Sequence, residues 1–415
     1  MPPTAPSDRL DADIVIAGAG AAGLSCAVQL GRTGVTRQLR VLLLDPREAY
    51  GRDRTWCFWD VVPHPFPDAV SHTWPTWRVA TPAGTVERSW PGLAYRHLPA
   101  DAFYEAALAS IGADPAVELR LGTRVGTIED VPGGVLVRTE RGPVRARLAL
   151  DGRPRRPRPE PAAGRDGRHA RLLQHFHGEV VRTAGDAFDP GIATVMDFRV
   201  PQETGIHFVY VLPFDRRTAL VEDTYFAGTP RPVEDYAAEI RSYLETRHGT
   251  SRFEVLHAET GAIPMDARPP SPRSGARIWN IGVRGGAARP STGYAFLTIQ
   301  RQAARIAERL AAWAEAPTRP PPGPPRVYSR RAAFLDRVFV SHLLRRPETA
   351  PDLFLRLFAR VRPDALARFL FDGGSPLDDL RVMAALPALP LVAETIRVYG
   401  SRPPRSPRAG NAPSP

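Results

Sequence analysis

A single motif near the start of the chain constrains the fold more than any other stretch of the sequence. An apolar run at residues 14–17 leads directly into Gly18, Gly20 and Gly23, which stand at the G-x-G-x-x-G spacing and precede a run of small, helix-compatible residues. In a dinucleotide-binding unit the first glycine permits a tight turn, the second lets the backbone approach the pyrophosphate, and the third lets the helix pack closely on the sheet. The motif therefore predicts a strand, a turn and a helix whose N-terminus faces a pyrophosphate.

A second apolar run, at residues 41–44, ends in Asp45, 22 residues beyond Gly23. At about this distance a βαβ unit places a carboxylate that hydrogen-bonds a ribose hydroxyl. The alternative is a glycine-rich turn in an ordinary βαβ unit, and the acid at this spacing makes a dinucleotide site the better explanation. The same acid favours a ribose without a 2′-phosphate, so we expect FAD or NAD rather than NADP.

The length of 415 residues suggests two domains, which can be interleaved. The sequence contains no lysine, so arginine supplies all 55 basic residues, and the formal net charge is +11. A compositional bias of the genome explains this pattern, and the functional alternative is a basic surface that attracts phosphates or anionic lipid headgroups. Without lysine the chain cannot use a Walker A loop, a lysine Schiff base or lysine-dependent flavin halogenation.

The two cysteines, Cys26 and Cys57, are too few for a disulfide framework or a zinc site, and they fit a reducing cytoplasm. The first ten residues are polar and proline-rich, which argues against a secretory signal. No run of 18 or more apolar residues occurs, so we expect no transmembrane segment. We expect neither a bound metal nor a nucleic-acid partner.

An aromatic cluster follows the second strand of the motif, where Trp56, Phe58 and Trp59 surround Cys57. A loop at this place in a dinucleotide fold commonly reaches toward a flavin ring or a substrate. Packing of the aromatic side chains beneath a long loop is an equally good explanation.

Residues 172–226 alternate in polarity and are rich in β-branched and aromatic side chains, which predicts an antiparallel sheet that could cover a ligand. Glu222 and Asp223 interrupt an apolar run within this segment. Buried carboxylates are costly unless they are paired or neutralised, so this pair calls for an explanation. Because adjacent side chains on a strand point to opposite faces, at most one of the two can face a pocket, and the pattern does not settle which.

A late strand at residues 278–282 is followed by Gly285 and Gly286, by the segment Pro-Ser-Thr-Gly-Tyr at 290–294, and by a long helix from about residue 295 to 315. Many flavoproteins close over the isoalloxazine ring with a strand, a glycine loop and a helix of this kind. Beyond a proline-rich break at 317–325, apolar residues at helical spacing predict a helical tail.

Four features, taken in order, resemble the lycopene cyclase family of flavoproteins. They are the glycine motif with Asp45, the segment Arg-Thr-Trp-Cys-Phe-Trp at 54–59, the strand at 208–210 that leads into Leu-Val-Glu-Asp-Thr at 220–224, and the segment at 290–294. The glycine motif is shared by many flavoenzymes, whereas the carboxylate pair and the last segment are much more specific. The resemblance implies an α/β architecture, in which a glutathione-reductase-like FAD-binding Rossmann fold carries an interleaved antiparallel-sheet substrate domain and a helical C-terminal tail.

The resemblance also implies a division of the chain. We expect an FAD-binding domain at 10–60, 95–154 and 258–316, a substrate-cavity domain at 61–94 and 170–257, a helical region at 326–400, and disordered tails at 1–9 and 401–415.

The implied reaction closes the end group of lycopene, or of a related acyclic carotenoid, into a β-ionone ring with no net redox change. The family's proposed acid corresponds to Glu222, and Asp223 would orient it or act as the base. Burial would keep such a glutamic acid protonated at pH 7. Reduced FAD would stabilise the carbocation by its negative charge, and NAD(P)H would serve only to reduce the flavin.

Two sets of residues follow from this interpretation. The cofactor-binding set is Gly18, Gly20, Gly23, Asp45, Arg54, Gly285, Gly286, Thr292, Gly293 and Tyr294. The substrate-cavity set is Trp56, Phe58, Trp59, Phe208 and Tyr210.

Two positions depart from the family pattern. Arg289 stands where related cyclases often carry a histidine, and the loop near Gly282 lacks the Gly-Asp pair that hydroxylase flavoproteins use. A hydrocarbon substrate resides in lipid, so we expect a cytoplasmic protein that docks peripherally on a membrane. The alternatives are a flavin monooxygenase or prenyl reductase acting on a lipid, which would consume NAD(P)H in proportion to product, and a non-catalytic isoprenoid carrier.

Overall fold

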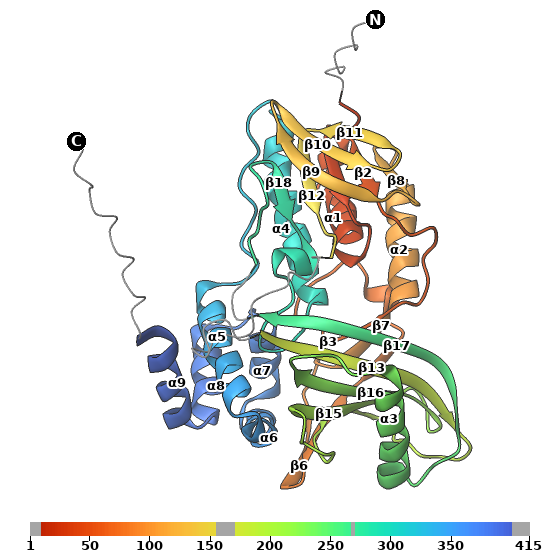
Figure 1. Cartoon of the computed structure of the whole chain (residues 1–415), viewed down its shortest axis with the longest axis vertical. Coiled ribbons are helices and arrows are strands. Elements are labelled where there is room, and N and C mark those ends of the chain that lie inside the picture. Colours follow the sequence, from red (N-terminus) through yellow and green to blue (C-terminus); the bar gives the residue numbers. More distant parts are fainter. Residues whose placement is uncertain (1–9, 155–170, 267–269, 401–415) are drawn as a thin grey trace, which may run out of the picture.

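The computed structural model describes residues 10–154, 171–266 and 270–400, which form two large sheets, smaller sheets and a cluster of C-terminal helices (Figure 1). The first large sheet is five-stranded and parallel throughout, with the strand order β18-β12-β1-β2-β8. Its strands are β1 (Ile14–Ala17), β2 (Val41–Leu44), β8 (Val117–Arg120), β12 (Leu148–Asp151) and β18 (Ile278–Asn280).

Both faces of this parallel sheet are covered, which explains why β1 and β2 read as continuous apolar runs. Ile14 and Ile16 belong to the main core, which also contains the buried sides of the surrounding helices, whereas Val15 and Ala17 pack against a three-stranded antiparallel sheet. The helices are α1 (Ala21–Arg32), α2 (Ala100–Gly112) and α4 (Phe296–Ala314), and the small sheet consists of β9 (Val125–Val131), β10 (Gly134–Thr139) and β11 (Gly142–Ala146).

The second large sheet has seven strands in the order β17-β13-β16-β15-β14-β5-β6. Its strands are β5 (Thr76–Thr81), β6 (Gly84–Ser89), β13 (Arg171–Thr183), β14 (Ile192–Asp197), β15 (Ile206–Pro213), β16 (Thr218–Ala227) and β17 (Phe253–Asp266). This sheet confirms the antiparallel segment that the sequence predicts after residue 172.

The two faces of the seven-stranded sheet have different neighbours. Val209 and Val221 pack beneath α3 (Val233–His248), and we call this side the outer face. Phe208 and Leu220, one residue away on the same strands, belong to the main core, and we call that side the inner face. The alternation of side chains along β15 and β16 thus separates a helix-covered face from a face that looks toward the rest of the molecule.

A three-stranded sheet in the order β3-β7-β4 links the two large sheets. Trp56 and Phe58 on β3 (Thr55–Trp59) contact Phe296 at the start of α4, with ring centroids 5.4 and 5.1 Å apart. Trp59 contacts Trp77 of β5 at 5.5 Å. The other two strands are β4 (His72–Trp74) and β7 (Tyr95–Pro99), and short 3-10 turns lie at η1 (Val35–Arg37), η2 (Pro67–Ala69), η3 (Gly282–Gly285) and η4 (Pro347–Thr349).

The C-terminal region is helical, as predicted, and lies beside the seven-stranded sheet (Figure 1). Arg289, in the loop before α4, forms an ion pair of 3.0 Å with Asp336 of α5 (Arg330–Arg345), and both side chains are buried. Ser291 Oγ donates to the same carboxylate at 2.7 Å. This buried contact explains what the unexpected arginine does, because it joins the loop at 290–294 to the helical region. The helices are α5 (Arg330–Arg345), α6 (Ala350–Arg360), α7 (Pro363–Leu370), α8 (Pro376–Ala385) and α9 (Ala388–Gly400).

One domain boundary differs from the sequence prediction. The sequence places the return to the FAD-binding domain at residue 258, but β17 continues in the seven-stranded sheet to Asp266, paired along its length with β13. The proposed tails at 1–9 and 401–415 lie outside the described residues. Within the described ranges, no single helix is long and apolar enough to cross a membrane, and α8 and α9 meet the length and composition test only as a pair bent by 115°.

Candidate functional site

The glycine motif adopts the strand, turn and helix that its spacing predicts. Gly18 has φ +94°, a left-handed conformation that favours glycine, and a Cβ on Gly23 would overlap the carbonyl oxygen of Gly18. A Cβ on Gly20 would meet only Arg47 Nη2, at 3.9 Å, so the backbone there is open to a ligand. No side chain caps the first turn of α1 at Gly20, which leaves its N–H groups available to an anion.

Asp45 lies at the end of β2 and is oriented by the glycine turn itself. Its Oδ2 accepts a hydrogen bond from the backbone N–H of Ala19 at 2.6 Å, and its Oδ1 accepts from the backbone N–H and Nε of Arg47 at 3.0 and 2.9 Å. Each carboxylate oxygen has further acceptor capacity, so a ribose hydroxyl could still donate to it. Arg47, which the sequence reasoning missed, adds a positive charge beside the open backbone of Gly20. These residues fit the ribose and pyrophosphate of a dinucleotide.

The late glycine loop lies against the same helix. A Cβ on Gly282, which has φ +61°, would meet the Cβ of Ala22 in α1 at 2.6 Å. Gly286 has φ +92°, and a Cβ on Gly285 would overlap the carbonyl oxygen of Asn280, so neither position tolerates a side chain. Gly285 and Gly286, which the sequence assigns to the cofactor site, therefore lie in a loop that approaches the N-terminal part of α1.

The segment at 290–294 precedes α4 and contacts the seven-stranded sheet. Gly293 has φ +72°, and a Cβ there would overlap Gln174 Oε1, a buried acceptor without a hydrogen-bond partner. Thr292 Oγ1 accepts from the backbone N–H of Tyr294 at 3.3 Å. An unsatisfied buried acceptor beside this turn is the kind of group that a bound cofactor or substrate would satisfy.

Arg54 is the predicted cofactor residue with the weakest structural support. Its side chain is largely exposed and pairs with Asp53 at 3.0 Å. Tyr104 Oη donates to Asp53 Oδ1 at 3.0 Å. The Arg47 guanidinium lies over the Tyr104 ring, 5.4 Å from the ring centroid. Arg54 thus connects to the glycine turn through a chain of side chains rather than directly.

Four residues form a row across the inner face of the seven-stranded sheet. On adjacent strands Glu222 pairs with Tyr210 of β15 on one side and with Gly178 of β13 on the other, and Gly178 pairs in turn with Glu259 of β17. Directly paired residues of an antiparallel sheet point to the same face, and Glu222 shares its parity with Leu220 of the main core. The structure therefore places Glu222 on the inner face, which answers the question that the sequence left open.

The surroundings of Glu222 favour its protonated form. Burial, reinforced by the nearby carboxylates of Glu259 and Asp223, raises the pKa of Glu222 to about 8, while a hydrogen bond that Thr224 Oγ1 donates to Glu222 Oε1 at 3.0 Å acts against this shift. At pH 7 the group therefore holds its proton in the folded protein. A neutral carboxylic acid in a desolvated site can donate that proton to a weak base.

Cys57, Tyr210 and Tyr294 surround the space in front of Glu222. Burial raises the pKa of all three groups, and the Cys57 pKa is raised further by the charges of Glu222 and Glu259, so the thiol lies near both acids. These residues and Glu222 nevertheless remain partly accessible, although they lie deep in the protein. From this residual exposure we infer a space between β3, the seven-stranded sheet and the loop at 290–294, which we call the inner pocket.

Three of the aromatic residues predicted to line the cavity fill the core instead. Phe58 and Trp59 are each 1% exposed, because Phe58 stacks on Phe296 and Trp59 packs among other aromatic rings. Phe208 is buried on the inner face against Phe226, with ring centroids 5.2 Å apart. Tyr210 keeps accessible surface and stays a candidate for the cavity wall. Trp56 also keeps accessible surface, but it lies on the other side of β3 from Cys57, against Phe103 and Phe296.

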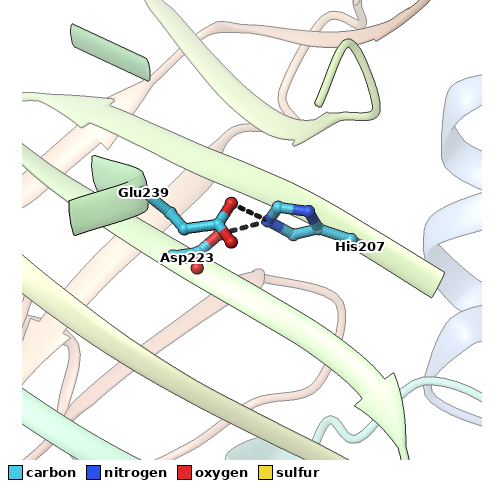
Figure 2. A group of neighbouring side chains, drawn as sticks. All are labelled: His207, Asp223 and Glu239. Carbon is cyan, nitrogen blue, oxygen red and sulfur yellow. Dashed lines mark hydrogen bonds and ion pairs between the residues drawn. The ribbon is translucent and has the colours of Figure 1, made fainter. Parts of the chain in front are cut away.

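Asp223 lies on the outer face, opposite to Glu222, because adjacent residues of a strand point to opposite sides. Figure 2 shows its carboxylate beside His207 and Glu239. Asp223 is fully buried, and its Oδ1 lies 2.5 Å from Nε2 of His207. Burial raises the pKa of Asp223, and the hydrogen bond and charge of His207 oppose that shift. The expectation that Asp223 acts directly as the base is not supported by this placement, because the sheet separates its carboxylate from the inner pocket.

His207, Asp223 and Glu239 also form a group whose ligand atoms lie within 4.8 Å of one another, the arrangement among the described residues that could hold a metal ion (Figure 2). His207 Nδ1 lies 2.8 Å from the carbonyl oxygen of Pro201, so Nδ1 must carry a proton that it donates. One proton shared between Nε2 and Asp223 Oδ1 is then sufficient to account for their short contact.

Glu259 is the functional candidate that the sequence reasoning missed. Odd-numbered residues of β17 from Glu259 to Met265 turn inward while the even-numbered ones are exposed, a weak alternation interrupted by Gly261 and Pro264. That alternation is the signal that could have identified a strand here. Only the pairing of β17 with β13 shows that its carboxylate shares a face with Glu222.

Solved flavoprotein structures share this fold. A geranylgeranyl bacteriochlorophyll reductase-like protein from Thermoplasma acidophilum has a TM-score of 0.59 and 12% identity, covering 92% of this chain and 98% of that one. A flavoprotein/dehydrogenase from Cytophaga hutchinsonii has a TM-score of 0.60 and 11% identity, covering 94% and 99%. At these identities the likeness establishes the fold class alone, an α/β architecture with a Rossmann-type domain, as the sequence predicts.

The chain belongs to the lycopene cyclase family, whose model, described as lycopene cyclase protein, matches residues 13–395. It is 29% identical to a lycopene beta-cyclase of Paracoccus sp. over 415 residues, covering 94% of this chain and 98% of that protein. It is 26% identical to the lycopene beta-cyclase of Pantoea ananas, covering 72% and 74%, and 26% identical to a chloroplastic neoxanthin synthase of Solanum lycopersicum, covering 73% and 61%. The family resemblance inferred from the motifs is confirmed.

Proposed function

We propose that this protein is an FAD-dependent lycopene cyclase, which closes the acyclic end group of lycopene or a related carotenoid into a β-ionone ring with no net redox change. Membership of the family and the similarity to lycopene beta-cyclases support this function. The single structural observation that carries it is Glu222, a carboxylic acid with a pKa near 8 on the inner face of the sheet. A proton-initiated reaction on a hydrocarbon needs an acid of this kind.

The reaction that fits the site is an isomerisation by proton transfer. Glu222 donates its proton to the terminal alkene and leaves a tertiary carbocation, an internal alkene then attacks that cation, and loss of a proton closes the ring. Desolvation of Glu222 serves the first step, since it keeps the acid neutral and excludes water that would capture the cation. The rings of Tyr210 and Tyr294 border the same pocket, and an aromatic face stabilises a cation by about 0.5–2 kcal/mol.

The residues that would hold the cofactor are the glycine turn with Asp45 and Arg47, and the loops at 282–286 and 290–294. Reduced flavin, when bound, would supply a negative charge to the cation, which at contact distance and an effective dielectric constant of about 20 is worth about 4 kcal/mol and exceeds what one aromatic ring offers. We propose that NAD(P)H serves only to reduce the flavin, so its consumption would not follow product formation.

We further propose that the protein docks peripherally on the cytoplasmic surface of a membrane to collect its substrate. Helix α9 exposes Leu389, Val392 and Ile396, with Leu389 84% exposed, and the neighbouring α8 exposes Leu377 and Leu380. The spacing in α9 places its three residues on one face of the helix. An exposed apolar helix face of this kind can enter the headgroup region of a bilayer. The two cysteines, neither of which forms a disulfide, agree with a reducing compartment.

Expression of the protein in a host that accumulates lycopene tests the proposed function. We expect cyclic carotenoids with the wild type and unchanged lycopene with Glu222→Gln, while both proteins retain FAD. Unchanged lycopene with the wild type would overturn the proposal. A redox alternative would be recognised with the purified protein, because a monooxygenase or a reductase would consume NAD(P)H in proportion to product.

A further inference from the structure

A second carboxylate faces the same inner pocket as Glu222. Glu259 lies two strands away on β17, separated from Glu222 only by Gly178 of β13, and the three residues are directly paired across the sheet (Figure 1 shows β16, β13 and β17 as neighbours). We propose that Glu259 is the base that accepts the proton lost at ring closure, and that its position selects which carbon loses that proton. This inference rests on the proposed function.

The gap between the two acids depends on the glycine. A Cβ on Gly178 would lie 3.1 Å from Cδ1 of Leu220 and 3.4 Å from Cβ and Cγ of Glu222, so a larger residue would crowd the acid. Neighbouring strands lie about 4.8 Å apart, which puts the backbones at Glu222 and Glu259 about 10 Å from each other. An acid and a base that face each other across such a gap suit a ring in which one carbon gains a proton and another loses one.

Residues of β3 cover this gap. Cys57 is close enough to both carboxylates for each to raise its pKa, which places the thiol over the gap between them. The side chain of Thr55, two residues earlier on the same strand, lies near enough to Glu259 to favour its ionised form. The strand that carries Thr55 and Cys57 therefore forms the opposite wall of the space that Glu222 and Glu259 share.

The surroundings of the two acids differ in a way that fits opposite roles. Glu259 is 8% exposed, and its Oε2 has no hydrogen-bond partner, so one acceptor oxygen is free. Burial raises the pKa of Glu259, which makes its carboxylate a stronger base than an exposed one, whereas the nearby Thr55 side chain and the charges of Arg52 and Arg54 favour the ionised form. Pairs of acids whose surroundings separate their proton affinities supply an acid and a base at the same pH.

The proton and electron balance of the step is complete without a further reactant. Glu222 gives a proton to the terminal alkene, whose π electrons form the new C–H bond. The internal alkene supplies the electrons of the new C–C bond and becomes the second cation. A C–H bond beside that cation then breaks, its electrons form the ring double bond, and its proton goes to Oε2 of Glu259. The cycle ends with Glu222 ionised and Glu259 protonated, and exchange of both groups with water restores the starting state.

The test compares purified, FAD-loaded wild type with Glu259→Gln, Glu259→Asp and the control Glu254→Gln, which changes an exposed carboxylate on the same strand. The measurements are kcat, KM and their pH dependence with lycopene, the position of the ring double bond in the product, and the flavin content. We expect Glu259→Gln to lower kcat at least 100-fold with FAD retained, since a positioned base contributes about that much or more. The remaining product should contain isomers with displaced ring double bonds, Glu259→Asp should recover part of the rate, and Glu254→Gln should match the wild type.

Three results would overturn the inference. The first is an unchanged rate and product with Glu259→Gln. The second is an unchanged product with only the alkaline limit of activity moved to lower pH, which would mean that Glu259 acts solely by raising the proton affinity of Glu222. The third is a loss of folding or flavin in Glu259→Gln while Glu259→Asp folds and gives the wild-type product at the wild-type rate. A wild type that leaves lycopene unchanged would instead refute the proposed function.

Discussion

Replacing Glu222 with glutamine should abolish cyclisation and at the same time stabilise the protein at neutral and alkaline pH. In the unfolded chain a glutamic acid has a pKa near 4.5, whereas burial raises that of Glu222 to about 8 in the folded protein. Between these values the folded state binds a proton that the unfolded state releases, so the free energy of unfolding falls as the pH rises. The contribution of Glu222 to stability is therefore complete below pH 4.5 and lost by about pH 8.

The magnitude follows from the shift. At 1.36 kcal/mol for each pH unit above 4.5, the loss is on the order of 3 kcal/mol at pH 7. Glutamine has the same shape and does not titrate, so Glu222→Gln removes this loss. The entropy of unfolding of a chain of this length is roughly 0.8 kcal/mol/K, which converts the difference into a melting temperature higher by about 4 °C at pH 7.

Thermal unfolding of the FAD-loaded proteins at pH 5 and pH 8 measures this effect. The difference in melting temperature between Glu222→Gln and wild type should be small at pH 5 and large at pH 8. Because both proteins contain the other buried acids, the contributions of those acids cancel in this difference. Glu254→Gln, an exposed carboxylate, should follow the wild type at both pH values. A difference that does not change with pH would refute the reasoning, because it would mean that Glu222 titrates near its ordinary pKa.

Three further outcomes follow from the structure. Asp223→Leu should lower stability by about 1–3 kcal/mol in urea unfolding, since it leaves buried His207 without its partner, but should reduce kcat much less than Glu222→Gln because Asp223 faces the other side of the sheet. Gly23→Ala should prevent FAD binding, measured by flavin absorbance, since its Cβ would overlap the turn at the start of α1. The pair Leu389→Glu and Ile396→Glu should reduce sedimentation with anionic vesicles while leaving turnover of detergent-solubilised lycopene unchanged, and unaltered sedimentation would remove α9 from the docking surface.

The parts of the fold that depend on local sequence were predictable. The spacing of Gly18, Gly20 and Gly23 sets a backbone geometry that few other folds use, and the continuous apolar runs of β1 and β2 reflect a sheet covered on both faces. The limit of the second domain was not predictable in the same way. Strand β17 belongs to the seven-stranded sheet because it pairs with β13, a contact between segments about 80 residues apart that no local pattern encodes.

The site was predictable in its residue types but not in its geometry. The carboxylates at 222 and 223 were identified from their cost in an apolar strand, yet choosing between them required knowing which side of β16 lies beneath α3. Glu259 was missed because its role depends on a partner two strands away. Phe58 and Trp59 were predicted to line the cavity, but they are buried in the core because β3 lies between two packed layers.

Cyclisation of lycopene in D₂O by the purified protein, with the flavin reduced once under anaerobic conditions and the product examined by mass spectrometry, tests the central claim most directly. Because the exchangeable proton of Glu222 becomes bound to carbon and a substrate proton leaves, the account predicts an isomer of lycopene that carries one deuterium for each ring formed, with no further reductant consumed. A cyclic product without deuterium, or a product that has gained two hydrogens or an oxygen atom, would contradict it.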